Sequence, residues 1–473
     1  MDSAPEDGTF YGPDWNFLFA DEDQITGGLL PGLATVLYED MRFDEVAQNQ
    51  ILYPEDKIPF ARLVPMGMQH VVAMFGATVL GPILMGFNPQ TALFFTGIGT
   101  LIFILTTRLK VPSYLGPSFA FIGPVLAVTG GDASKVPFAL CGIAAAAVLY
   151  AAAALATMRW GSGWIDRLMP PVVTGTVVAI IGVNLAPSAV ANAINAESTV
   201  SSAADFTRLG IAAATFLTAA LVSIYLRGFL RLLPILMGVI VGYALSAFFG
   251  ILNPHAVDHI RTAAWIGLPP FRTPAFSLNA ILVIAPVFIV LVAENKGHLA
   301  AISGYMGRDL NPQLGRAYLG DALATLVSAM GGGTPQTTYA ENMGVMAITR
   351  VFSTYNFIMA ACIAILLGLC PKFGAIIQSI PNPVLGGTTL ILYGLIAIMG
   401  VRIWIDAQVD FSDDKNLVIA GASLIAATGL GTKGLTVAGL NIAGIAFGTV
   451  LALVLNLCLS IGREAEEGRR REG

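Results

Sequence analysis

Long apolar stretches follow one another almost without interruption from residue 60 onward, separated by short polar or glycine- and proline-rich connections. An apolar run of about 20 residues is long enough to cross a bilayer as a helix. The third and tenth stretches are too short for this, and each follows a Gly/Pro-rich piece. We expect fourteen membrane segments, near residues 61–84, 89–107, 114–129, 136–158, 171–190, 208–226, 229–250, 277–301, 317–331, 339–350, 354–370, 382–400, 415–430 and 437–461.

The composition agrees with this pattern. The chain is 55% hydrophobic and only 12% charged, with a mean hydropathy of +0.74, whereas a soluble domain has a charged fraction of about 25%. A transmembrane β-barrel would have short alternating segments instead. The sequence therefore predicts an all-α polytopic membrane protein. It has no phosphate-binding loop, dinucleotide-binding fingerprint, zinc-protease motif or nucleophile elbow, so we do not expect an enzyme.

Charge is unevenly distributed along the chain. Residues 1–60 are rich in acids and predict a solvated N-terminal extension, with an amphipathic or gating role as the alternative. Residues 462–473 form a basic C-terminal tail. Loops after even-numbered segments hold more Lys and Arg than loops after odd-numbered ones, which predicts cytoplasmic termini and a cell-membrane location. The cysteines lack metal-ligand spacing and read as membrane-core residues: Cys141, Cys362, Cys370 and Cys458.

Several segments resemble the segment seven places further along the chain. The stretch "PVVTGTVVAIIG" (171–182) aligns without gaps with "PVLGGTTLILYG" (383–394). Segments seven and fourteen both contain GxxxG, and residues 118–121 align with 338–341. Because seven is odd, these matches predict two inverted halves, at 61–250 and 277–461. In such repeats, paired interrupted segments are the best sequence indication of a transporter's binding site.

Few ionisable residues lie within the predicted spans. A charge at the bilayer centre costs roughly 2.5–3.5 kcal/mol by the lower estimates, so these residues are candidates for function. Glu294 and His298 are four residues apart and share a helix face, which favours proton coupling or substrate contact over a pair that only locks packing. Glu341 lies where an extended stretch becomes a helix.

Two further polar positions have structural interpretations. Lys296 lies on a different face from Glu294, and we expect it to pair with Asp321. His70 lies early in the first segment, where a structural hydrogen bond and a part in transport are both open.

Five motifs in order resemble the nucleobase–ascorbate transporter (nucleobase–cation symporter-2) family, and its uracil-transporting bacterial members most of all. "ENMGVMAITR" (341–350) fits the family signature. The resemblance covers about residues 60–460 and includes "QHVVAMFGATVLGP", "YLGPSFAFIGP", "AENKGHL", "TPQTTYAENMGVMAITRV" and "LILYG". It implies two inverted seven-segment repeats, with short strands in segments 3 and 10. Segments 1–4 and 8–11 would form a core domain, and segments 5–7 and 12–14 a gate domain.

The resemblance also implies a function and a set of site residues. It implies import of uracil by proton symport and alternating access, with no metal or other cofactor and no nucleic acid bound. It also implies a protein in membrane lipid, and family members often dimerise through the gate domain. By motif position, Glu294 and Glu341 would contact the pyrimidine, and His298 would join them in proton coupling. Backbone N–H groups at Phe119 and Ala340 would hold carbonyl oxygens. The remaining cavity residues would be Ala77, Tyr339 and Tyr393.

The residue types suit such a substrate. Uracil is neutral, with two N–H donors and two carbonyl acceptors, so two carboxylates and two helix-start N–H groups would complement it. Ala340 departs from the family, whose uracil-transporting members have glycine there. A purine such as xanthine or uric acid is the alternative substrate. An anion exchanger or channel of the same fold is more remote, because two acids repel anions.

Overall fold

The computed structural model describes residues 51–194, 203–227, 230–231, 233–431, 434–437 and 440–472. Most of the predicted acidic extension, residues 1–50, lies outside the described residues. The compact unit that contains all the described residues begins at Ile51. The predicted C-terminal tail, residues 462–473, continues the last helix, α20, as far as Glu472. It holds four Arg and four Glu and so has no net charge, and the prediction of a basic tail is wrong.

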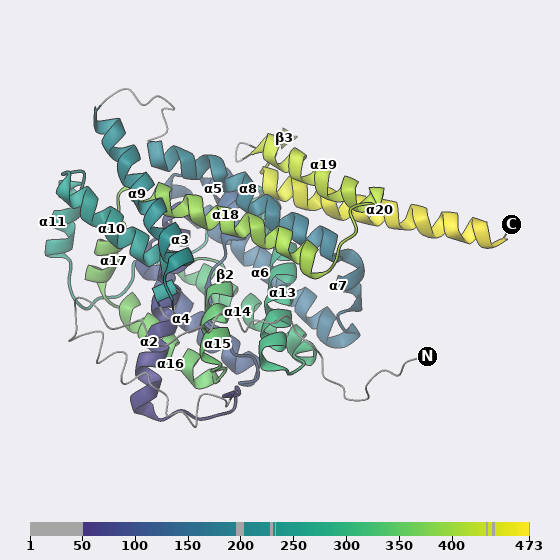
Figure 1. Ribbon diagram of the computed structural model, residues 1–473, viewed down its shortest axis with the longest axis horizontal. Helices are drawn as coiled ribbons and strands as arrows, with labels where there is room; N and C mark the ends of the chain where they lie inside the picture. Colours follow the sequence, from purple (N-terminus) through teal and green to yellow (C-terminus); the bar gives the residue numbers. More distant parts are fainter. Residues whose placement is uncertain are drawn as a thin grey trace. The chain divides into compact units, whose positions relative to one another are not determined.

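The described part of the chain is mainly helical, with two small two-stranded sheets (Figure 1). The strands are β1 (Leu115–Pro117), β2 (Gln336–Thr338), β3 (Leu435–Val437) and β4 (Leu440–Ile442). The described helices are α2 (Phe60–Ala73), α3 (Phe75–Met85), α4 (Pro89–Thr106), η3 (Phe119–Phe121), α5 (Ile122–Thr129), η4 (Ala133–Lys135), α6 (Val136–Trp160), α7 (Gly163–Leu168), α8 (Pro171–Ile194), α9 (Ala203–Tyr225), α10 (Pro234–Phe248), α11 (Pro254–Thr262), α12 (Leu278–Ile284), η6 (Ala285–Val287), α13 (Phe288–Met306), η7 (Asn311–Gln313), α14 (Leu314–Gly331), α15 (Ala340–Thr349), α16 (Thr354–Gly368), α17 (Pro371–Gln378), α18 (Asn382–Asp406), α19 (Asp414–Leu430) and α20 (Gly444–Glu472).

Each predicted segment overlaps a helix, or a strand followed by a helix. Within the described residues, six helices are long and apolar enough to cross a membrane, or eight if each of two bent helix pairs counts as one span. The pairs are α2 with α3, bent by 42°, and α16 with α17, bent by 81°. The protein is thus a helical, multi-pass membrane protein, and the short strands predicted in segments 3 and 10 are confirmed as β1 and β2.

One predicted boundary is wrong. The sequence predicts a last segment that begins near residue 437, but α20 begins at Gly444. Strands β3 and β4 occupy the preceding stretch and pair antiparallel, with Leu435 opposite Ile442. Branched and polar residues alternate in both strands, a pattern that fits a pleated hairpin better than a continuous helix.

The helices form two groups, which Figure 1 shows as an upper and a lower set. In the upper set, α8 packs along α18, α9 along α10, and α19 along α20. In the lower set, α4 packs against α14 and α16, and α14 also packs against α6. Helices α8 and α18 approach closely because glycines lie at their crossing. A Cβ on Gly182 would lie 2.4 Å from the carbonyl oxygen of Tyr393.

Both GxxxG motifs lie at helix contacts, in equivalent positions. In α10, a Cβ on Gly242 would meet Thr215 of α9 and Val384 of α18. In α20, a Cβ on Gly448 would meet Ala427 of α19 and Ile180 of α8. Each motif therefore lies where its helix contacts both the preceding helix and a long helix from the other half of the sequence: α9 and α18 for the motif in α10, and α19 and α8 for the motif in α20.

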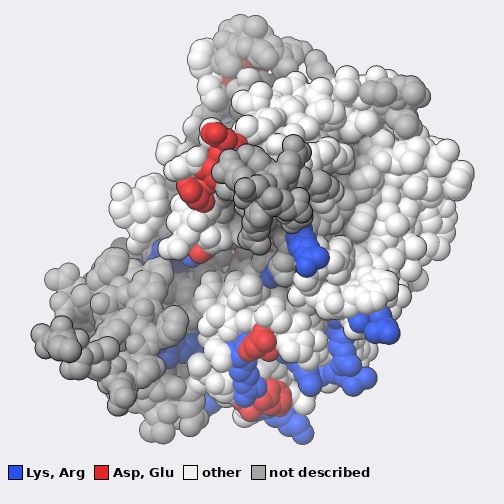
Figure 2. All heavy atoms as spheres, turned by 90° about the vertical axis from the view of Figure 1, so that its right-hand side faces the viewer, with Lys and Arg blue, Asp and Glu red and all other residues white. Residues whose placement is uncertain are grey.

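Surface charge is sparse. Figure 2 shows one face on which most of the described surface is uncharged and most of the visible Lys and Arg side chains lie in the lower half. A wide uncharged surface with basic residues toward one end is the distribution expected of a protein embedded in a bilayer.

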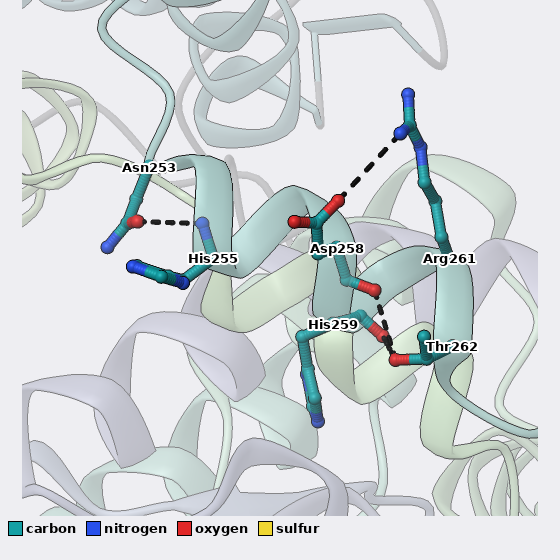
Figure 3. Close-up of polar contacts among 6 residues, drawn as sticks. All are labelled: Asn253, His255, Asp258, His259, Arg261 and Thr262. Atoms are coloured by element: carbon teal, nitrogen blue, oxygen red, sulfur yellow. Dashed lines mark hydrogen bonds and ion pairs between the residues drawn. The ribbon is translucent and has the colours of Figure 1, made fainter.

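A polar helix, α11, lies in the connection between α10 and α12 and packs on α17. Asn253 caps it by accepting a hydrogen bond from the His255 N–H at 3.0 Å (Figure 3). Asp258 and Arg261 form an ion pair at 3.8 Å, and Thr262 donates to the Asp258 carbonyl at 3.0 Å. Asparagine followed by proline is a strong helix-start signal, and it explains a helix in this connection.

Candidate functional site

Two strands from opposite halves of the sequence meet inside the helical core. Strand β1 pairs antiparallel with β2, and Leu115 lies opposite Thr338. The strand edges bond to hydroxyl groups of neighbouring helices: Leu115 N donates to Thr100 Oγ1 at 3.0 Å, and Gln336 N donates to Thr325 Oγ1 at 3.0 Å. Non-helical backbone at membrane depth persists only when it is buried in protein in this way or lines a cavity.

A helix begins immediately after each strand. Helix η3 begins at Phe119 and continues as α5, and α15 begins at Ala340. No side chain caps either start. The first N–H groups of a helix have no partner within it and carry the positive end of the helix dipole. The pair of strands therefore places two donor-bearing helix starts, at Phe119 and Ala340, in one region. That their N–H groups hold carbonyl oxygens stays a prediction.

The two predicted carboxylates belong to this region. Glu294 lies in the middle of α13, and its carboxylate is close enough to Glu341 and to Thr337 of β2 to interact with both. Glu294 Oε2 and Thr337 Oγ1 are nevertheless buried without a hydrogen-bond partner among the described residues, as is Ser118 Oγ. Buried polar atoms are normally paired, and unpaired ones call for a specific explanation such as a ligand.

His298 is held by the second strand. Its Nδ1 lies 2.8 Å from Thr338 Oγ1, one helical turn along α13 from Glu294. The predicted Glu294–His298 face of α13 therefore packs along β2, which contributes Thr337 beside the acid and Thr338 beside the imidazole.

Tyr339 packs over the first strand. Its hydroxyl donates to the Pro117 carbonyl, and its ring centroid lies 6.4 Å from that of Phe119. The ring covers Gly116 so closely that a Cβ there would lie 2.0 Å from Tyr339 Cε2. Phe119 and Tyr339 are therefore neighbours at the strand ends.

The last two predicted cavity residues are buried. Ala77 lies in α3, which packs against β1. Tyr393 lies in α18 at the crossing with α8, and its hydroxyl is buried near Ser188 without a hydrogen bond to any described residue. None of the contacts described for Tyr393 reaches the strands, so its role as a cavity wall stays a prediction.

A polar cluster behind Glu294 was not predicted. The Asn295 side-chain amide donates to Tyr150 Oη at 3.1 Å and also to Asp321 Oδ2. The expected pair between Lys296 and Asp321 is therefore wrong. Successive helix residues are rotated by about 100°, so Asn295 and Lys296 cannot both face α14. The sequence signal for this cluster is Asn295 itself, an amide directly after Glu294 in an apolar span.

His70 makes a hydrogen bond between helices, which is the structural one of the two interpretations given for it. His70 Nδ1 lies 3.0 Å from Asn342 Oδ1, and the imidazole packs on Phe357 at 4.5 Å between ring centroids. This bond joins α2 to the first turn of α15, next to Glu341.

Known permeases are similar to this chain in sequence over most of its length. A pyrimidine permease of Escherichia coli (strain K12) is 46% identical over 424 residues, which cover 87% of this chain and 93% of that protein. A uracil permease of the same organism is 40% identical over 412 residues, covering 86% and 93%.

Solved structures with the same fold are more distant in sequence. The structure of SLC26A9 matches with a TM-score of 0.60 at 11% identity and covers 90% of this chain and 71% of that one. The transmembrane domain of the cyanobacterial bicarbonate transporter BicA matches with a TM-score of 0.57 at 16% identity, covering 86% and 100%.

The family itself is shown by sequence. Residues 61–434 match the sequence pattern of the Permease family. The expectation of a transporter rather than an enzyme is thereby confirmed. The chain, with its paired strands and two helix starts, belongs to the Permease family.

Proposed function

We propose that this protein is a proton-coupled symporter that imports uracil by alternating access. The observation that supports this proposal most directly is the set of buried polar groups around β1 and β2: Glu294 Oε2 and Thr337 Oγ1, which lack hydrogen-bond partners, and two uncapped helix starts. Uracil has two N–H donors for the acids and two carbonyl oxygens for the helix N–H groups. The names of the pyrimidine and uracil permeases support the same substrate.

The proposed architecture has fourteen crossings in two inverted repeats. The helix contacts support it, because they recur when each element is exchanged for the one seven segments away. The contact of α4 with α16 recurs as that of α14 with α6, and the contact of α9 with α18 recurs as that of α19 with α8. The lower helix group would be the core domain and the upper group the gate domain. Both termini would be cytoplasmic, with dimerisation through the gate.

The two acids and His298 support a proton as the coupling ion. A neutral substrate brings no charge, so protein groups must carry the coupling ion. A proton on Glu294 would neutralise a carboxylate that otherwise has the like charge of Glu341 beside it. His298, one turn away and fixed by Thr338, is the neighbouring group through which that proton would pass.

The test is uptake of labelled uracil into proteoliposomes at two external pH values, with unlabelled competitors. We expect greater uptake at the lower external pH, collapse with a protonophore, and competition by uracil. Competition by xanthine or uric acid alone would instead support a purine symporter. An anion current indifferent to nucleobases would support an anion exchanger or channel, for which the likeness to SLC26A9 and BicA supplies only the fold.

A further inference from the structure

The segment just before α2 is hydrogen-bonded to the chain just beyond the C-terminal end of α15, the helix that carries Glu341. Leu52 forms a parallel bridge with Val351. Its N–H donates to the Arg350 carbonyl at 3.1 Å, and its carbonyl accepts from the Phe352 N–H at 2.7 Å. These bonds lie immediately beyond the C-terminal end of α15.

The pairing continues into the start of the next helix. The Pro54 carbonyl accepts from the Thr354 N–H at 3.1 Å and from the Thr354 hydroxyl at 2.7 Å. The Asp56 carbonyl accepts from the Ser353 hydroxyl at 2.6 Å. Ser353 and Thr354 are fully buried. The contact is therefore an ordered, well-packed one and not a loose crossing of two loops.

The same segment contacts Arg308, just beyond the C-terminal end of α13, the helix that carries Glu294. Arg308, just beyond α13, donates from Nη1 to Glu55 Oε1 at 2.7 Å. Its guanidinium carbon lies 3.4 Å from the centroid of the Tyr53 ring. Tyr53 itself is held in place because its N–H donates to Asp56 Oδ2 at 2.7 Å.

The backbone at the end of α15 depends on support of this kind. Arg350 ends the helix in the left-handed conformation, with φ of 53°. A non-glycine residue keeps such a conformation where the surrounding structure over-determines it. The bond from Leu52 to the Arg350 carbonyl supplies one of these constraints.

We propose that residues 51–56 form a clamp that fixes the ends of α13 and α15 relative to each other and so sets the spacing of Glu294 and Glu341. Tyr53, Glu55 and Arg308 are positioning residues, which act on the site through these two helices without touching substrate. The inference rests on the proposed function for its substrate, a pyrimidine nucleobase. Its structural part does not depend on that substrate.

The test uses the full-length protein in lipid nanodiscs and compares Arg308→Gln with Arg308→Lys and Tyr53→Leu with Tyr53→Phe. Lysine keeps the charge for Glu55, and phenylalanine keeps the aromatic face for Arg308. Arg402→Gln is the matched control, because Arg402 forms a similarly exposed ion pair with Asp406 at 3.4 Å, in α18 and outside the clamp.

Hydrogen exchange without nucleobase is the first measurement. An exposed ion pair and a cation–π contact are each modest, so we expect about 3- to 10-fold faster exchange at the Leu52, Phe352 and Thr354 amides in Arg308→Gln and Tyr53→Leu. The first turn of α15, residues 340–344, should exchange faster as well. The lysine, phenylalanine and Arg402 variants should stay near wild type. Unchanged exchange in residues 340–344 would overturn the positioning role, whatever the protein transports.

Uracil binding and uptake are the second measurement. We expect a rise in KM and in the dissociation constant of about 3- to 10-fold for Arg308→Gln, in line with its exchange, and largely restored values for Arg308→Lys. Faster exchange with unchanged uracil affinity and KM would overturn the link from the clamp to the site. Failure of wild-type protein to bind uracil would instead contradict the proposed function, while the exchange result would still decide the clamp.

Discussion

His298 Nδ1 lies 2.8 Å from Thr338 Oγ1. This contact joins α13, which carries Glu294, to β2, the strand that leads to Glu341. Because the imidazole and the hydroxyl are largely buried, each satisfies a group that would otherwise lack a partner. This contact fixes the orientation of the imidazole one turn from Glu294.

Replacing Thr338 with valine should reduce transport. The change keeps the shape of the side chain but leaves His298 without its partner, at a cost of about 1–3 kcal/mol. We expect lower uptake and an altered dependence of uptake on pH. Thr338→Ser, which keeps the hydroxyl, should behave like wild type. Equal pH profiles for the valine and serine variants would argue against a role for this bond.

Glu294→Gln should abolish uracil binding and uptake, because a neutral amide cannot replace a carboxylate that accepts hydrogen bonds and carries a proton. Tight uracil binding by Glu294→Gln would contradict the role we assign to this residue.

Glu341→Gln should weaken uracil binding and admit purines, measured by competition with labelled uracil.

Gly116→Ala should damage the site through Tyr339. The new Cβ would lie 2.0 Å from the tyrosine ring, and overpacking of this kind costs about 1–3 kcal/mol. Uracil affinity should fall. A Gly116→Ala/Tyr339→Ala double variant lacks the ring that the new Cβ would meet, so it should recover stability but not binding. Gly394→Ala is the control, since nothing lies within 4 Å of a Cβ there. Normal uracil binding by Gly116→Ala would contradict the close packing of Tyr339.

Double-mutant cycles should distinguish the two partners considered for Asp321. Asn295 donates to the Asp321 carboxylate, so Asn295→Ala and Asp321→Ala should be coupled in thermal stability by about 0.5–3 kcal/mol. Lys296→Ala and Asp321→Ala should show additive effects. Coupling in the second cycle and additivity in the first would restore the original pairing.

The clamp should weaken in acid. The hydrogen bond from Arg308 lowers the pKa of the Glu55 carboxyl below its usual value. A lowered pKa in the folded protein means that the stabilisation is present above the ordinary glutamate pKa and is lost as pH falls through the lowered one. The difference in thermal stability between wild type and Glu55→Gln should therefore shrink at pH 3–4 relative to pH 7. A difference that grows in acid would contradict this sign.

The sequence alone determined the membrane location, the approximate positions of the apolar segments and the two interrupted segments. These depend on local properties: apolar runs long enough to span a bilayer, and glycine or proline where a helix must break. Glu294, Glu341 and His298 stood out because charges inside an apolar span are costly.

Only the tertiary structure decided which polar groups meet. Asp321 pairs with Asn295 and not with Lys296 because the rotation of α13 is set by every helix packed around it. His70 and Asn342 are 272 residues apart, and Pro54 and Thr354 are 300 apart. No local pattern encodes such contacts, because each depends on how two distant segments are brought together by the packing of the whole core.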